Sequence, residues 1–382
     1  MLKHLTGGRK RDWVFCVVTI IICIVLWQIP TGLETDYAQI DRVKVEILEV
    51  DNTTLEPLGI VYAGTQKCNV RVLSGEYEGV ISMAYNHQNS SLDKDKLFCT
   101  GEKGLAMIQA VDDGYRITLI DHYRLDTEAL LFGLFGILLI LFGGISGCGA
   151  LISLVLSIML VWKVLIPALL AGMSPIWVSL GMVLVLTAMI DLLVAGFSKK
   201  ALVAMLGSLQ GTLLTCVLAV VFGNMLKLDG GSLPYVVPLL SQSTMTLNLR
   251  ELFYAMVFIA NSGALMDLSM DISCACDEIC YHKPEIQKWE LLKSGFAVGK
   301  SVIGTMTTTL MLAYSGSYLS MLMYFAGQGT PVMDIVNLKY VASEVLITLV
   351  GSFGLVTVAP FTALTAMAFY GKGKMHQAQM DA

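Results

Sequence analysis

The chain has 382 residues, of which 55% are hydrophobic and only 14% are charged, and its formal net charge is −5. Ordinary globular domains carry about 25% charged residues, so this composition is typical of a protein that crosses a membrane several times. The small net charge and the lack of a Lys/Arg block in the sequence exclude a nucleic-acid-binding protein. The lipid bilayer is therefore the first expected partner.

A basic segment opens the chain and leads into an apolar run. Four Lys and Arg residues lie within the first eleven positions, and residues 13–29 are almost entirely apolar. This order resembles a signal peptide, but residues 27–30 lack the small residues of a cleavage site. We predict that residues 1–36 form a cytoplasmic N-terminus and an uncleaved signal-anchor helix.

The segment 37–126 holds most of the soluble character of the chain. Apolar and polar residues alternate in several short runs separated by Gly-containing turns, a pattern that indicates half-buried strands. The predicted strands are 43–50, 68–73, 80–85, 104–111 and 115–120. About five short strands predict a small OB-like barrel outside the cytoplasm that is able to bind a protein partner. Whether Cys68 and Cys99 pair is left open by the sequence.

The remainder of the chain, 127–382, is predicted to be a seven-helix transmembrane domain. Its apolar runs are long enough to cross a hydrocarbon core of about 30 Å. The predicted helices are 129–146, 149–171, 175–196, 201–226, 251–273, 300–326 and 341–370. With the signal anchor, the fold class is a membrane all-α helical bundle of about eight transmembrane helices, with the small β-domain inserted after the first.

The distribution of Lys and Arg predicts the orientation in the membrane. If the N-terminus is cytoplasmic, the short outer loops hold only Lys227, Arg250 and Lys339, and basic residues concentrate in the cytoplasmic segments. The cytoplasmic ones are Lys3, Arg9, Lys10, Arg11, Lys199, Lys200, Lys283, Lys288, Lys293, Lys300, Lys372 and Lys374. This positive-inside bias predicts that both termini are cytoplasmic.

Three polar residues lie inside the apolar run near residue 265. Asn261, Asp267 and Asp271 share one predicted helix, and the spacing of Asp267 and Asp271 places both carboxylates on one face. A carboxylate at membrane depth costs about 2.5–3.5 kcal/mol on insertion scales, so it usually faces a bundle interior or a wet cavity. The functional interpretation is a proton or cation site. The alternative is that Asp267 only bonds to neighbouring helices and Asp271 already reaches the interface.

The favoured partner of these acids is the threonine run that begins at Gly304. Thr305, Thr307 and Thr308 carry hydroxyls that both donate and accept hydrogen bonds, and they could line a path past Asp267. Threonines also bond back to their own helix, which is the competing structural explanation. Asp191 is a further candidate within the membrane.

The sequence gives little support for a metal site or for an enzyme. Cys274, Cys276, Cys280 and His282 are close in sequence, but their spacing matches no common zinc pattern. No catalytic or phosphate-binding fingerprint occurs in the sequence. We therefore expect neither a cofactor nor a metal, and no enzymatic activity.

The order of anchor, β-domain and helices resembles the YibE/YibF family of bacterial membrane proteins. The resemblance covers nearly the whole chain and rests on the motifs at 196–202, 262–271, 304–314 and 349–354. That family has no established activity, so the resemblance implies architecture and a bacterial plasma membrane but no reaction. The chain departs from the family pattern at Cys274, Cys276 and Thr308.

A second, local resemblance concerns about fifty residues. The stretch from Gly263 to Asp267, then Glu278, then Gly304 to Thr308 looks like the helix-four to helix-five segment of resistance-nodulation-division and SecD/SecF-type permeases. In those permeases an acid in such a helix takes part in proton coupling. The resemblance implies the same role for Asp267.

Two hypotheses of function follow. The first is a proton- or ion-coupled transporter, permease or export accessory for an unknown small solute or ion, with Asp267 as the coupling acid. The second is a membrane scaffold or sensor that does not transport, whose β-domain binds a partner while the acids only hold helices together. The sequence leaves the substrate, the direction of transport and the oligomeric state open.

Overall fold

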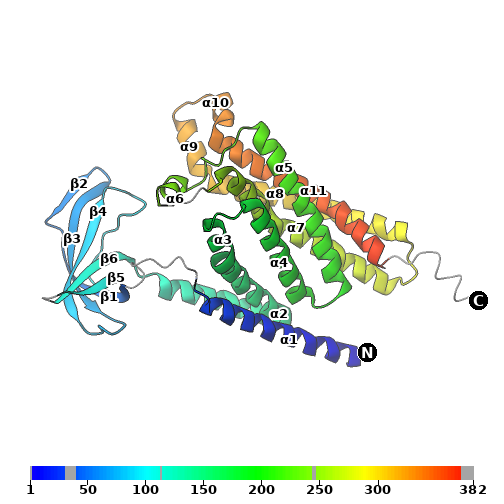
Figure 1. The fold of residues 1–382 in the computed structure, drawn as a ribbon, viewed down its shortest axis with the longest axis horizontal. Coiled ribbons are helices and arrows are strands. Elements are labelled where there is room, and N and C mark those ends of the chain that lie inside the picture. Colours follow the sequence, from blue (N-terminus) through cyan, green and yellow to red (C-terminus); the bar gives the residue numbers. More distant parts are fainter. Residues whose placement is uncertain (1, 31–39, 112–113, 243–246, 371–382) are drawn as a thin grey trace, which may run out of the picture. The chain divides into compact units, whose positions relative to one another are not determined.

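The computed structural model describes residues 2–30, 40–111, 114–242 and 247–370, and for residues 2–14 the backbone alone (Figure 1). The chain divides into two compact units, one made of Met1–Ile29 with Leu139–Ala382 and the other of Pro30–Leu138. The first is helical and the second contains all the strands. The boundary predicted at residues 36 and 37 and the basic Lys372 and Lys374 lie outside the described residues.

The smaller unit contains a barrel that five strands close. Strand β1 pairs with both β3 and β5, β3 pairs with β4, and β6 joins β4 to β5, which completes the ring. All these pairs are antiparallel except β4 with β6. A sixth strand, β2, pairs only with β3. The strands are β1 (Asp41–Asp51), β2 (Leu55–Leu58), β3 (Val61–Val72), β4 (Ile81–Asn89), β5 (Lys103–Val111) and β6 (Gly114–His122).

The prediction of a small barrel after the first helix is confirmed. Alternate residues of the strands point inward, so that Val43, Val45 and Ile47 of β1 enter one apolar core. Cys68 is buried in that core whereas Cys99 is exposed, and both thiols are free. The short strand β2 was not predicted.

A buried amide fills part of the barrel interior. The side-chain NH₂ of Gln66 donates to Asn52 Oδ1 at 2.8 Å and to the Phe98 carbonyl at 2.9 Å. Its carbonyl accepts from the Phe98 amide and from Asn86 Nδ2, both at 3.0 Å. Because Gln66 is fully buried, these four bonds offset the cost of removing the amide from water.

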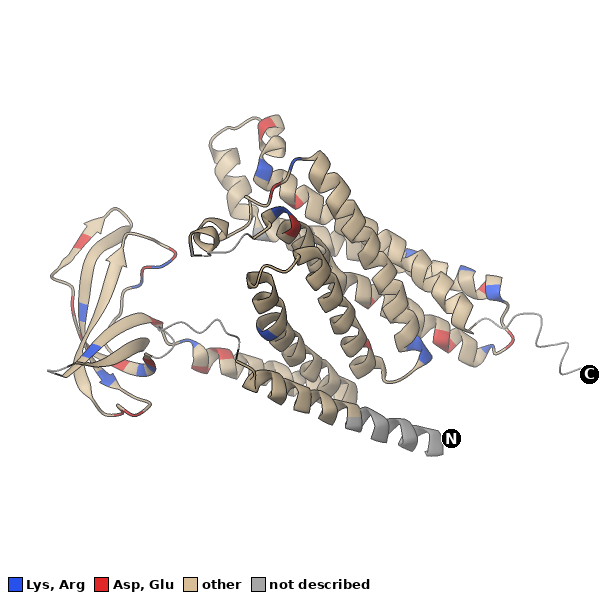
Figure 2. Cartoon of the chain, in the orientation of Figure 1, with Lys and Arg blue, Asp and Glu red and all other residues tan. Residues whose placement is uncertain are grey.

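The larger unit is a bundle of long helices. Six helical stretches are long and apolar enough to cross a membrane among the described residues. Figure 2 shows Lys and Arg mainly near the ends of the helices, as expected for membrane-spanning segments. The helices are α1 (Leu2–Gln28), α2 (Leu125–Leu160), the π-helical turn η2 (Val161–Leu165), α3 (Ile166–Leu170), α4 (Pro175–Ala195), α5 (Lys199–Met225), α6 (Val236–Gln242), α7 (Leu249–His282), α8 (Lys288–Ser317), α9 (Leu319–Gly327), α10 (Val332–Asn337) and α11 (Lys339–Tyr370).

The prediction of about eight transmembrane helices is not confirmed. Leu125–Leu170 is one of the six stretches, and within it two helices meet at Gly144, in agreement with the separate helices predicted at 129–146 and 149–171. Gly144 has φ 55° and ψ −128°, a conformation that suits a residue without a Cβ atom. Of the residues of α1 whose side chains are described, the apolar helical part is Phe15–Gln28, which is shorter than a typical span.

Glycines let α11 pack closely against two neighbours. A Cβ atom on Gly207 or Gly211 of α5 would lie 2.1 Å or 3.2 Å from side-chain atoms of α11. On α8, Gly295 and Gly299 approach Ala363 and Ala359 of α11 in the same way. Both pairs have the small-xxx-small spacing by which membrane helices come into van der Waals contact. The helix α11 is thereby held between α5 and α8.

Candidate functional site

Helix α4 carries a polar stripe that faces the bundle. Ser179, Val183, Thr187 and Asp191 recur every four residues, so they share one face of the helix, and all four are buried. This face packs against α5 and α7. The fold therefore places Asp191 inside the protein, although it lies only one turn from the end of α4 at Ala195.

Asp191 is sealed and incompletely bonded. Its side chain is 1% exposed, and its Oδ2 atom has no hydrogen-bond partner among the described residues. Buried polar atoms in native proteins nearly always have a partner, so each exception calls for an explanation. A carboxylate oxygen in this position can carry a proton or accept a bond from a small cation or a donor group.

Asp267, unlike Asp191, lies on an exposed helix face. It lies on the side of α7 that also carries Gly263 and Asp271, and all three are exposed in the single chain. We expected this face to point into the bundle. The buried face is instead that of Asn261 and Leu265, because Gly351 and Gly354 of α11 allow the closest helix contact there.

The two carboxylates nevertheless form one electrostatic group. Asp191 and Asp267 are close enough for their charges to interact, and Asp267 also interacts with Asp271. Lys200 lies in the same region, since it acts electrostatically on Cys274 together with Asp191 and Asp271. No salt bridge joins either Asp191 or Asp267 to a basic residue within the described part of the chain. Negative charge on both carboxylates at once would be strongly unfavourable in a membrane.

Two of the three predicted threonines form hydrogen bonds within their own helix. The hydroxyls of Thr305 and Thr308 are exposed and donate to carbonyls of their own helix, Val302 at 2.9 Å and Gly304 at 3.0 Å. The Thr307 hydroxyl is buried and has no partner in the described structure. Among the described residues, no hydrogen bond links any of these threonines to Asp267. The back-bonded geometry is the structural explanation that the sequence left open for Thr305 and Thr308.

Asn261 joins three helices. Its NH₂ group donates to the Val257 carbonyl at 2.6 Å and to the Ile347 carbonyl of α11 at 3.4 Å. Its carbonyl accepts from the Tyr314 hydroxyl of α8 at 3.2 Å. With 1% exposure and a full set of partners, Asn261 holds α7, α8 and α11 together. Asn261 was predicted to belong to a polar path, and this geometry supports a structural role for it.

The cysteine-rich end of α7 forms no metal-like cluster. Among the described residues, no group of three or more His, Cys, Asp and Glu side chains is arranged to hold a metal ion. His282 instead lies 2.9 Å from Glu278, one turn earlier on the exposed surface. Cys276 is buried against the α8–α11 contact.

The sequence underestimated two features of this region. Asp191 was predicted only as a further candidate, yet its charge interacts with that of Asp267, as does the charge of Asp271. The four-residue repeat of polar and small residues along α4 was the available signal. Lys200 was counted only as a topology marker, and its proximity to Cys274 depends on how α5 packs against α7.

The fold and the site define a class: a multi-pass membrane protein with a small β-barrel after its first helix and carboxylates on two packed helices whose charges interact. The particular family follows from the sequence match. The YibE/F-like protein family matches residues 131–372, and the chain belongs to this family. The match takes in the helical region and leaves the barrel outside. Neither a search of curated proteins nor a search of solved structures gave a match.

Proposed function

We propose that this protein is a proton- or cation-coupled transporter or export accessory in which Asp191 and Asp267 bind the coupling ion. The observation that carries the proposal is the pairing of a sealed carboxylate that has an unbonded oxygen with an exposed carboxylate on the neighbouring helix. A proton or a small cation shared by the two removes the repulsion between them. The exposed member, Asp267, receives the ion, and the sealed member, Asp191, holds it.

The threonines have a reduced part in this proposal. Thr305 and Thr308 are available to an ion only after breaking the bonds to their own helix. The Thr307 hydroxyl has no partner in the part of the chain that the structure describes, and it is the member of the run that supports a polar path. The local resemblance to proton-coupled permeases points in the same direction for Asp267.

The orientation belongs to the proposal too. The excess of Lys and Arg in the segments assigned to the cytoplasm supports cytoplasmic termini and a barrel on the outer side of a bacterial plasma membrane. We also interpret the barrel as OB-like, because its ring of five strands closes through a parallel pair, β4 with β6.

A membrane scaffold or sensor is the second candidate function. Asn261 supports it, because this residue shows that polar side chains in the bundle do join helices. The outer face of β4 supports it as well, since Ile81, Met83 and Tyr85 are exposed at alternate positions and suit contact with a partner. On this hypothesis Asp267 needs no titration.

Amide substitutions separate the two candidates. Asp191→Asn and Asp267→Asn keep the size of the side chain and most of its hydrogen bonding but remove the negative charge and the bound proton. We expect both variants to insert and fold normally and yet to abolish the growth phenotype that the intact gene restores to a deletion strain profiled across ions and toxic compounds. Asp271→Asn is the matched control one turn away, with a milder expected effect.

A second measurement does not depend on knowing the substrate. Infrared spectra of the purified protein, recorded while the pH is changed, report protonated carboxyl groups directly. We expect one carboxyl signal that is lost in Asp191→Asn and altered in Asp267→Asn, and that Asp271→Asn retains. A stable, fully active Asp267→Asn protein with an unchanged spectrum would contradict the coupling proposal and favour the scaffold or sensor function.

A further inference from the structure

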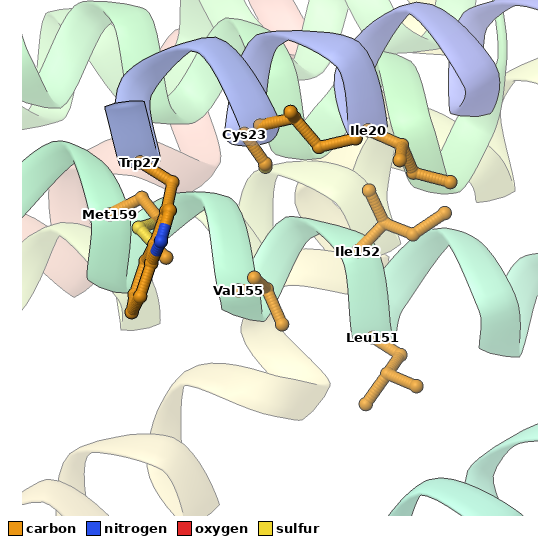
Figure 3. Close-up of a pocket in the computed structure, with 8 residues that line it drawn as sticks. Ile20, Cys23, Trp27, Leu151, Ile152, Val155 and Met159 are labelled. Atoms are coloured by element: carbon orange, nitrogen blue, oxygen red, sulfur yellow. The ribbon is translucent and has the colours of Figure 1, made fainter. Parts of the chain in front are cut away.

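An apolar groove runs between α1 and the second half of α2. It has a volume of about 370 Å³, and every residue that lines it is apolar or a cysteine (Figure 3). The lining residues extend along each helix for about 11 Å, from the 1.5 Å rise per residue. They are Ile20, Cys23, Ile24 and Trp27 of α1 with Leu151, Ile152, Val155 and Met159 of α2.

One end of this α1–α2 groove carries a cation. Trp27 and Met159 lie at the same end in Figure 3. Lys163 follows Met159 by one helical turn, and its ammonium donates to the carbonyl of Ile29, two residues beyond Trp27, at 2.9 Å. Within Phe15–Ile29 and Leu139–Leu170, Lys163 is the one charged residue. It therefore sets the charge of this end of the groove.

The backbone places Lys163 there. It is the central residue of η2, the π-helical turn Val161–Leu165 that interrupts the regular helix between α2 and α3. Such turns are uncommon and often occur at functional positions, because the extra residue redirects side chains. Ile29 O is the one acceptor within hydrogen-bonding distance of Lys163 Nζ in the described structure, so an ammonium with three N–H donors retains two.

We propose that the α1–α2 groove binds an anionic phospholipid, with an acyl chain between the two helices and the phosphate on Lys163. The apolar lining matches an acyl chain, and the lone cation beside Trp27 matches a headgroup phosphate at the level where Trp and Lys anchor to the membrane interface. The charge at this end distinguishes the site from ordinary lipid-facing surface, which has no preference for a headgroup. The lipid would join α1 to α2.

The experiment compares lipid retention by the purified full-length protein. Native mass spectrometry is carried out with phosphatidylglycerol and phosphatidylcholine that have identical acyl chains. We expect the protein to retain phosphatidylglycerol in preference, and Lys163→Gln to lower that preference about fivefold, as for one Lys beside an anionic lipid surface. Lys163→Arg keeps the cation and should keep the preference.

Filling the groove provides the second arm. Val155→Trp places a large side chain in the groove and should remove bound lipid of both kinds. Ile158→Trp is the matched control, because Ile158 is 57% exposed on the same helix and does not line the groove. Equal loss in the two variants, or an unchanged headgroup preference in Lys163→Gln, would overturn the proposal in favour of nonspecific surrounding lipid.

A measurement in membranes covers the case in which Val155→Trp does not fold. Lipids with brominated acyl chains quench nearby tryptophans. We expect brominated phosphatidylglycerol to quench the native protein more than brominated phosphatidylcholine does, and Trp27→Phe to remove that difference. Equal quenching of the native protein by both lipids counts against a specific site.

Discussion

Buried and exposed helix faces in this bundle carry the same kinds of residue, glycines and polar side chains, in different surroundings. On the inner face Asn261 is buried and bonded to two other helices, while Asp267, within two turns of it, is exposed. The glycines likewise fall into a group in close helix contact and a group in open space. A Cβ atom on Gly351 would lie 1.8 Å from Asn261 Oδ1, whereas Gly263 and Gly304 have no neighbour within 4 Å.

This difference separates residues that the fold requires from residues that it does not. Close helix contact explains the glycines on the inner face, because a larger side chain would not fit there. It also explains Asn261, because a less polar side chain would lose the hydrogen bonds between helices. The single chain gives no packing reason for Gly263, Gly304 or Asp267 on the outer face. Asp267, whose charge interacts with that of the buried Asp191, marks the part of that face where an ion-binding function is best sought.

The largest expected effect comes from closing the tightest contact on the inner face. Gly351→Val would place a branched side chain where Asn261 now lies, and we expect it to destabilise the protein by about 3 kcal/mol or more. Size-exclusion profiles and thermal melting of the purified protein measure this. Gly304→Val at the open glycine of α8 is the control, and a normal melting temperature for Gly351→Val would contradict the packing.

A smaller effect is expected from removing the amide that joins three helices. Asn261→Leu leaves the Tyr314 hydroxyl without its acceptor and should cost about 1–3 kcal/mol. The matched double variant with Tyr314→Phe should recover part of the loss, because the orphaned hydroxyl is gone. Thermal melting that shows additive losses would indicate that the two groups do not interact.

A small change of the opposite sign is expected on the outer face. Gly304→Ala adds a methyl group where nothing lies within 4 Å, and removing a helical glycine should stabilise the chain by about 0.5–1 kcal/mol. Thermal melting in a mild detergent checks this. A clear loss of stability would show that another molecule packs against Gly304.

The smallest expected effect lies in the barrel, at Asp95. Its pKa is lowered chiefly by the hydrogen bond from the Asn89 amide, with further bonds from Ser91 and Ser90. Because the folded pKa is depressed, this contribution is present above the pKa of the unfolded state and is lost as the pH falls through the folded value. Asp95→Asn should flatten the acid limb of a stability–pH curve slightly, and an unchanged curve would argue against these bonds.

The pattern of side chains predicted local structure well and helix packing poorly. Alternation predicted β1 and its neighbours because one face of each strand is buried in the barrel core. Strand β2 escaped prediction, since Leu55–Leu58 is short and contains Pro57. The predicted helix 300–326 is broken at Tyr318 into α8 and α9 without any Pro to signal it.

The site was predictable in its residues but not in its orientation. Polar groups within apolar runs marked Asn261, Asp267 and Asp191, because such groups are costly in a membrane. Both faces of α7 are apolar enough to be buried, so periodicity could not decide which face meets α11. The close approach of Gly351 to Asn261 decided it.

By itself the sequence determined that this is a multi-pass membrane protein of the YibE/F-like family with a barrel after the first helix, since composition, run length and alternation are local properties of the chain. Only the tertiary structure decided which face of α7 is buried and that the charges of Asp191 and Asp267 interact. It also decided that Lys163, one turn beyond Met159 at one end of an apolar groove, donates to the Ile29 carbonyl. These are contacts between segments far apart in the chain, and they depend on which helix faces can approach most closely.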